Sequence, residues 1–132
     1  MIEDIRPEAD GDFHILVRLD VPYAHMINEG NIDHQHGDLV VETICENEVT
    51  QPDAIASCSD FSGSIEIPSV GTNVTITGTY VFDSQHYDWA EIHPATSINP
   101  VEIPEFPLPV LGLVLSLATS LIIIFRIQSK ES

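Results

Sequence analysis

The feature that most constrains this chain is an uninterrupted apolar run close to its C-terminus. Residues 108–125 read LPVLGLVLSLATSLIIIF and contain no charged side chain. At about 1.5 Å of rise per residue, about 20 helical residues cross a hydrocarbon core of roughly 30 Å, and the run reaches that length together with Phe106 and Pro107. The sequence therefore predicts one transmembrane helix over residues 108–125.

The charges on either side of this run predict its orientation. Arg126 and Lys130 follow it closely, whereas Arg6 and Arg18 are the only Lys or Arg before it in a chain of net charge −17. Because Lys and Arg concentrate on the cytoplasmic side of membrane helices, we expect residues 126–132 to form a cytoplasmic tail. The expected localisation is a single-pass protein of the cell membrane, with its acidic domain extracytoplasmic.

Small residues recur within the apolar run. Gly112, Ser116 and Ser120 are spaced four apart and so share one face of the expected helix. This small-xxx-small pattern lets two helices approach closely and predicts a helix-packing face. Chance spacing of small residues is the alternative.

The residues before the apolar run resemble a known sorting signal. Pro104, Glu105 and Phe106, an apolar helix and a basic end follow one another in that order, which is similar to the PEF-CTERM signal of archaeal surface proteins. The resemblance covers the segment from Ile103 onward. It implies export, recognition by an archaeosortase-like enzyme, and cleavage near the tripeptide with transfer to a membrane lipid. The alternative is a permanent anchor behind a proline-rich neck at residues 100–107.

The N-terminus lacks the features of a signal peptide. Residues 1–13, MIEDIRPEADGDF, contain neither a basic region nor an apolar stretch. Since the basic tail and the sorting-like tripeptide both favour an exported domain, we expect a signal peptide to be encoded upstream of Met1. The alternative is tail-first insertion with the domain inside. Residues 1–12 are acidic and poor in apolar side chains, and we expect them to form a disordered acidic leader.

The strong acidity of the chain restricts its partners. A net charge of −17 repels nucleic-acid phosphate, because binding a polyanion requires Lys or Arg to displace its counterions. The same charge suits cations, basic partners, or a salty medium in which carboxylates keep the surface hydrated. We therefore expect no nucleic-acid partner, and the sequence does not define an envelope partner.

Short segments of alternating polarity predict a β-domain over residues 13–99. In the strongest of them, NVTITGTYVF at residues 73–82, apolar residues alternate with threonines, as in a strand with one buried face. Gly78 in its middle predicts a bulge or a sharp bend. Further strands are expected at residues 14–19, 38–45, 64–67 and 89–93.

Five short strands in a domain of this size favour a small closed or nearly closed barrel. The stretch IPSVGTNVTITGTYV, residues 67–81, is similar to the turn and long coiled strand of an OB-fold. An immunoglobulin-like sandwich uses similar residue types but usually has more strands. The expected fold class is mainly β, a small OB-like five-stranded barrel followed by one C-terminal transmembrane helix.

A second resemblance lies in the globular part. Its residues are Asp83, His86, Trp89, Glu91, His93 and Pro94, which form D-x-x-H followed by W-x-E-I-H-P. Together with residues 36–42 and Cys45, this pattern is similar to a signature of uncharacterised secreted bacterial and archaeal domains. The resemblance supports the fold and implies no activity.

Histidines and carboxylates near this signature form a candidate metal site. On a strand, Glu91 and His93 point to the same face because side chains alternate with period two. His86 or His36 from a loop would complete the site, and imidazole with carboxylate suits Zn²⁺, Cu²⁺ or Ni²⁺. A divalent transition metal is the cofactor that His36, His86, Glu91 and His93 would hold. The alternative is that His93 is structural and bonds a backbone carbonyl.

Two further modifications are expected of an exported domain. Cys45 and Cys58 predict one disulfide, worth roughly 3 kcal/mol in the chain-entropy model. Free thiols or metal ligation are the alternatives, and the absence of C-x-x-C weakens the second. Asn73 opens an N-x-T sequon and would carry a glycan, unless the tripeptide arises by chance.

Motifs for enzymatic chemistry are sparse. A nuclease needs Lys or Arg beside the reacting phosphate, and only Arg6 and Arg18 precede the apolar run. The sequence contains neither a G-x-S-x-G elbow nor a Gly-rich phosphate loop. We expect a binding or cell-envelope structural role rather than an enzyme. A metal-binding surface domain is the first alternative and a secreted hydrolase or nuclease the second.

Overall fold

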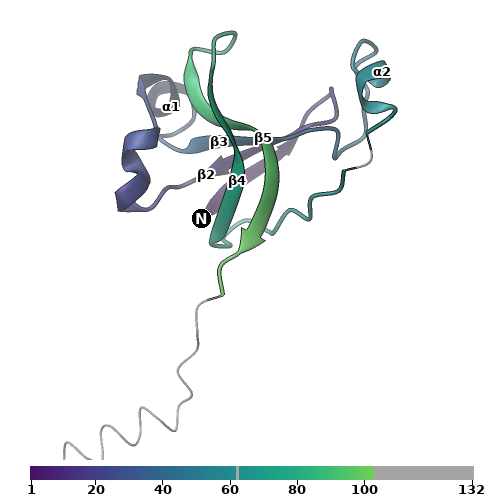
Figure 1. The fold of residues 1–132 in the computed structure, drawn as a ribbon. Helices are drawn as coiled ribbons and strands as arrows, with labels where there is room; N and C mark the ends of the chain where they lie inside the picture. The colour runs from purple at the N-terminus through teal and green to yellow at the C-terminus, as the bar shows by residue number, and fades with distance from the viewer. Residues whose placement is uncertain (62, 103–132) are drawn as a thin grey trace, which may run out of the picture. The chain divides into compact units, whose positions relative to one another are not determined.

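The computed structural model describes residues 1–61 and 63–102, which form one mixed β-sheet with short helices (Figure 1). The strands are β1 (Ile2–Pro7), β2 (Phe13–Val17), β3 (Leu39–Thr43), β4 (Val74–Asp83) and β5 (Trp89–Pro100). The helices are the 3-10 helix η1 (Val21–Met26) and the α-helices α1 (Glu29–His34) and α2 (Ile55–Cys58).

The sheet has the strand order β1-β2-β3-β5-β4 and is open. All neighbouring strands are antiparallel except β3 and β5, which are parallel. At one end Ile2 exchanges backbone hydrogen bonds with Gly71 and Thr72, but no ladder joins β1 to β4 in the part of the chain that the structure describes. The mainly β prediction is confirmed, whereas the sheet does not close into the expected barrel.

Alternating side chains give the sheet two different faces. Ile15 and Val17 on β2 and Val41 on β3 are buried in the main hydrophobic core. Their sequence neighbours, including His14 on β2 and Glu42 on β3, point to the opposite face because side chains alternate along a strand. The polar candidate site is built on this second face.

The N-terminal strand differs from the expected disordered leader. Residues 2–7 form β1, which pairs antiparallel with β2 from Ile2↔Val17 to Pro7↔Phe13. Ile2 is completely buried in the core and Ile5 packs against it, so these two apolar side chains anchor an otherwise mainly charged segment. Charged residues are typical of sheet edges, where they discourage pairing with other chains. The disorder predicted from the acidic composition of residues 1–12 is therefore wrong for residues 2–7.

Two other strands differ from their predicted extents. Residues 64–67, expected to be a strand, form none, and the backbone N–H of Ile65 instead donates to Oε1 of Glu46 at 2.8 Å. Strand β5 continues past Pro94 to Pro100 because it pairs with β4 along nearly its whole length. The bulge predicted at Gly78 is confirmed by register shifts on both sides of this residue.

Helix α1 packs against the start of β5 and sets the positions of residues near the site. Asn28 and Asn31 form a capping box at its N-terminus. The side chain of Asn31 is buried and hydrogen-bonds both the N–H and the C=O of Ala90. The C-cap residue of α1 is Gln35, whose side chain reaches the polar face.

The predicted disulfide between Cys45 and Cys58 is confirmed. The two Cα atoms lie 5.5 Å apart, and 13 positions separate the residues in the sequence. The bond links the end of β3 to the end of α2. The N–H of Cys45 donates to Oδ1 of Asp12 at 2.8 Å, so the disulfide-bonded loop also holds a residue of the polar face.

Several predicted features lie outside the described residues. These are the transmembrane helix at 108–125, the tail at 126–132, the tripeptide Pro104–Phe106 and the packing face of Gly112, Ser116 and Ser120. In the ranges 1–61 and 63–102, no helix has the length and apolar character needed to cross a membrane. Asn73 of the sequon is exposed immediately before β4.

Candidate functional site

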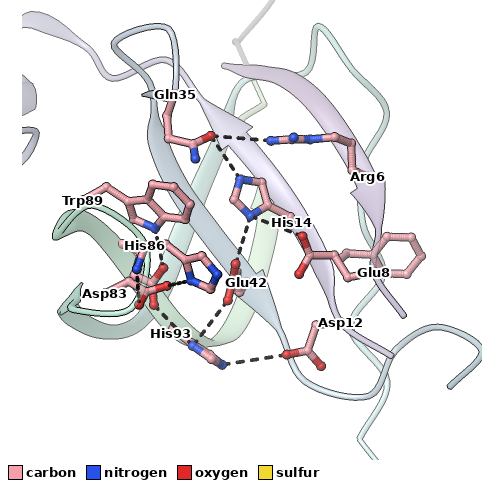
Figure 2. A network of polar contacts seen from close by, with 12 residues as sticks. Arg6, Glu8, Asp12, His14, Gln35, Glu42, Asp83, His86, Trp89 and His93 are labelled. Atoms are coloured by element: carbon pink, nitrogen blue, oxygen red, sulfur yellow. Dashed lines mark hydrogen bonds and ion pairs between the residues drawn. The ribbon is translucent and has the colours of Figure 1, made fainter. Parts of the chain in front are cut away.

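The polar face of the sheet carries a cavity of about 600 Å³ whose lining is strongly acidic (Figure 2). Its carboxylates are Glu8, Asp10, Asp12, Glu42, Asp83 and Glu91. Arg6 is the only Lys or Arg among the described residues that line it, and His14, His86 and His93 are its histidines. With neutral histidines, six carboxylates against one guanidinium leave five uncompensated negative charges. Such a cavity attracts cations.

Strand register brings three of these side chains into one row. Arg6 on β1 pairs with His14 on β2, and His14 pairs with Glu42 on β3. Side chains that are directly opposite on neighbouring strands lie close enough to interact. Nδ1 of His14 accordingly lies 2.9 Å from Oε1 of Glu42. His14 is only 4% exposed, so this contact is shielded from solvent.

The hydrogen bonds of His14 identify the roles of its two ring nitrogens. Nε2 lies 3.3 Å from Oε1 of Gln35, and Nη2 of Arg6 donates to the same oxygen at 3.5 Å. Because a guanidinium can only donate, this atom of Gln35 is the acceptor, and Nε2 of His14 carries a hydrogen. In neutral His14, Nδ1 then has a lone pair that faces Glu42. The contact between Nδ1 of His14 and the Glu42 carboxylate is attractive only when a proton or a metal ion lies between the two atoms.

The carboxylate of Glu8 is the third group near Nδ1 of His14. Oε1 of Glu8 lies 3.8 Å from Nδ1 of His14. Glu8, His14 and Glu42 each offer one ligand atom, and these atoms all lie within 4.8 Å of one another. This set of one imidazole and two carboxylates is the first of two possible cation positions in the cavity, and we call it the His14 set.

His93 is the centre of the second set. Its Nδ1 lies 3.3 Å from Oε1 of Glu91 and 3.4 Å from Oε2 of Glu42, and its Nε2 lies 3.9 Å from Oδ2 of Asp12. Asp12, Glu42 and His93 offer ligand atoms that are also within 4.8 Å of one another. We call these three residues the His93 set. Both sets contain Glu42.

Electrostatics favour a positive charge on His93. The hydrogen bond with Glu91 is the largest cause that raises its pKa, to about 8, and Glu42 and Asp12 raise it further against the opposing effect of burial. Without a bound metal, His93 is therefore mainly an imidazolium at neutral pH. A metal ion at this position would have to displace that proton.

Glu91 holds the ring of His93 in place. Glu91 is 2% exposed, and its Oε2 accepts a hydrogen bond from Nε1 of the neighbouring Trp89 at 2.9 Å. Its other oxygen faces His93. Both oxygens of this buried carboxylate are thus used, which fixes the orientation of the imidazole.

Two carboxyls of the sets have raised pKa values. Burial is the largest cause for Glu8, and the nearby charge of Glu42 adds to it. Burial is also the largest cause for Asp12, where the bond from the Cys45 N–H lowers the pKa and the charge of Asp10 raises it. Crowded, partly buried carboxylates of this kind gain from a cation between them.

Asp83 and His86 form a separate pair at the rim of the cavity. Nδ1 of His86 lies 2.6 Å from Oδ2 of Asp83, and the imidazole stacks on Trp89 with ring centroids 5.4 Å apart. Burial raises the pKa of Asp83, but hydrogen bonds from His86 and the Gln85 N–H outweigh it and lower the pKa overall. The same hydrogen bond raises the pKa of His86.

Of the four residues that the sequence proposed as ligands, three line the cavity, but only His93 belongs to one of the two ligand sets found among the described residues. His86, Glu91 and His93 line the cavity. His36 does not: it is exposed in the turn after α1, with a positive φ of 58°.

Sequence reasoning missed four residues, His14, Glu42, Glu8 and Asp12. The available signal was a polar residue in an otherwise apolar strand, in FHILV and in LVVET. That signal does not say which strands are neighbours, so it could not join these residues into one site.

No protein-family model, no curated protein and no solved structure matches this chain. Only the geometry and chemistry of the site itself therefore bear on its function.

Proposed function

We propose that this chain is a membrane-anchored extracytoplasmic domain that binds a divalent transition metal ion, Zn²⁺ or Cu²⁺, on the polar face of its sheet. The observation that carries the proposal is the orientation of buried His14. Its Nε2–H donates to Gln35, and its Nδ1 faces Glu42 and Glu8. A metal-binding histidine usually donates its other ring N–H to an oxygen in this way, which fixes the tautomer and aims the free nitrogen at the ion.

The residue types favour a transition metal over Ca²⁺ or Mg²⁺. Both sets combine one imidazole with two carboxylates, and imidazole nitrogen suits Zn²⁺ and Cu²⁺. Calcium and magnesium prefer ligands that are all oxygen. Three protein ligands per ion also leave room for a water molecule, as in zinc sites that keep an open position.

Two features support an extracytoplasmic location. The Cys45–Cys58 disulfide is typical of proteins in oxidising compartments. Exposed Asn73 in its sequon would be accessible to a glycan-transferring enzyme there. For the anchor, the support is the apolar run 108–125 followed by basic residues, and the PEF tripeptide supports processing by an archaeosortase-like enzyme.

Metal uptake by the full chain in mild detergent tests this function. We expect Zn²⁺ to bind in equilibrium dialysis and calorimetry, and binding to weaken strongly in His14→Gln and in His93→Gln. His36→Gln is the matched control and should bind as the parent chain does, because His36 lies outside the cavity. Circular dichroism checks that each variant is folded, and half-exposed His93 makes its variant the safer of the two. Absence of uptake, or loss of uptake in His36→Gln alone, would overturn the proposal.

A further inference from the structure

We infer that the cavity holds two metal ions and that the carboxylate of Glu42 bridges them. This inference rests on the proposed metal-binding function and adds the number of ions and the residue that they share. It assigns the first ion to the His14 set and the second to the His93 set (Figure 2).

The two oxygens of Glu42 face different imidazoles. Oε1 lies 2.9 Å from Nδ1 of His14, and Oε2 lies 3.4 Å from Nδ1 of His93. A carboxylate that offers one oxygen to each of two groups has the arrangement that a bridging ligand needs. Glu42 lies between His14 and His93, with a side chain only 13% exposed, so its position is well defined.

Each ion would have its own outer carboxylate. Glu8 lies near His14 at 3.8 Å, and Asp12 lies near His93 at 3.9 Å. These two carboxylates belong to different sets and come from the segment between β1 and β2, where they flank the cavity. Each set therefore combines one imidazole and one outer carboxylate with the shared Glu42, but Asp12 faces Nε2 of His93 whereas Glu42 faces its Nδ1.

Charge balance favours a second ion. The cavity has five uncompensated negative charges when its histidines are neutral. One divalent ion in the His14 set would leave two of them beside the protonated His93, whereas two ions, the second in place of that proton, would leave one. In known two-metal sites the ions are about 3.5–4 Å apart, and a cavity of about 600 Å³ has room for such a pair with bound water.

The number of ions per chain tests the inference. We expect elemental analysis after dialysis to give two Zn²⁺ per folded chain, and one in either Glu8→Gln or Asp12→Asn. Glu42→Gln should lose both ions or hold them far more weakly. Asp53→Asn is the matched control, because Asp53 is an exposed carboxylate that does not line the cavity, and it should retain two.

Electron paramagnetic resonance of the Cu²⁺-loaded chain tests the bridge independently. Two Cu²⁺ ions that share a carboxylate couple magnetically, so the parent chain should give a half-field signal that Asp12→Asn lacks. A single ion per chain would overturn the two-ion inference and leave the proposed function intact. No uptake would overturn both. Two uncoupled ions, both retained by Glu42→Gln, would overturn the bridging role of Glu42.

Discussion

The side-chain amide of Asn31 makes two hydrogen bonds to the backbone of Ala90, of the kind that a neighbouring strand would otherwise make. Oδ1 of Asn31 accepts a hydrogen bond from the Ala90 N–H at 2.9 Å, and Nδ2 of Asn31 donates to the Ala90 carbonyl at 2.8 Å. Nδ2 also donates to the carbonyl of Asp38 at 3.1 Å. One buried side chain thus connects α1 to β5 and to the residue before β3. This connection keeps Gln35 and Trp89 beside the polar cavity.

Replacement of Asn31 by Ala should strongly destabilise the fold. It leaves buried backbone groups without partners, and each such group costs about 1–3 kcal/mol. We expect a loss on the order of 3 kcal/mol in the free energy of unfolding, measured by urea denaturation of the full chain. Asn99→Ala is the control and should change it by less than about 0.5 kcal/mol, because Asn99 is exposed. Equal small effects in both variants would contradict this account of Asn31.

Replacement of Gly78 by Ala should also destabilise the sheet. A Cβ atom at this position would lie 2.6 Å from the carbonyl oxygen of Pro94 and would clash with the side chain of Ile92. Since both neighbours belong to β5, the hairpin would have to open locally, at a cost of about 1–3 kcal/mol. Thermal unfolding measures the effect, and Gly71→Ala tests whether any added methyl group is harmful. Gly71 has open space for a Cβ but a positive φ, so its penalty would come from the backbone alone.

The sequence predicted four strands of this sheet because they are partly buried. Alternation of side chains is visible in β4, whereas β2, β3 and the first half of β5 are short, mainly apolar segments. Strand β1 escaped detection since it lies at the edge and contributes only Ile2 and the partly buried Ile5 to the core. The open shape also could not be predicted, because it depends on whether the edge strands β1 and β4 pair, which they do not in the described residues, and a local pattern does not reveal which distant segments pair.

The candidate site was only half visible in the sequence for a similar reason. Glu91 and His93 lie two positions apart on one strand, so local spacing was enough to place them together. His14 and Glu42 are 28 positions apart and become neighbours only through the register of β2 and β3. The orienting role of Gln35 depends on where α1 ends, which no sequence pattern indicated.

Loss of the disulfide should weaken both the fold and one metal position. The Cys45→Ala/Cys58→Ala double variant should lose about 3 kcal/mol of unfolding free energy by the chain-entropy model. The Cys45 N–H holds Asp12, and Sγ of Cys58 contacts the carbonyl of Asp10 at 3.5 Å. We therefore expect Zn²⁺ to leave the His93 set first. Calorimetric titration that shows two unchanged binding steps in this variant would contradict the coupling.

Without metal, His93 should make stability depend on pH. Its pKa is raised to about 8 in the folded chain, above an unfolded value of 6.5, so folding favours its protonated form. This contribution is fully present below about pH 6.5 and is lost as the pH rises through about 8. Urea denaturation in the presence of a chelator should show this decline, and His93→Gln should flatten it. A decline of the same size in the variant would assign the effect to other groups.

Glu91→Gln should lower the pKa of His93 toward its ordinary value. The hydrogen bond that His93 donates to Glu91 is the largest cause that raises this pKa, and a neutral amide cannot stabilise the imidazolium equally well. An amide oxygen can still accept the hydrogen bond of Trp89, so the local packing should survive. Titration of the His93 ring protons by nuclear magnetic resonance, in metal-free full chain, measures the shift. His86 provides the internal control, because its pKa is raised mainly by Asp83 and should change little. A pKa near 8 for His93 in the variant would show that Glu42 and Asp12 suffice to hold the proton, and Glu91 would then only orient the ring.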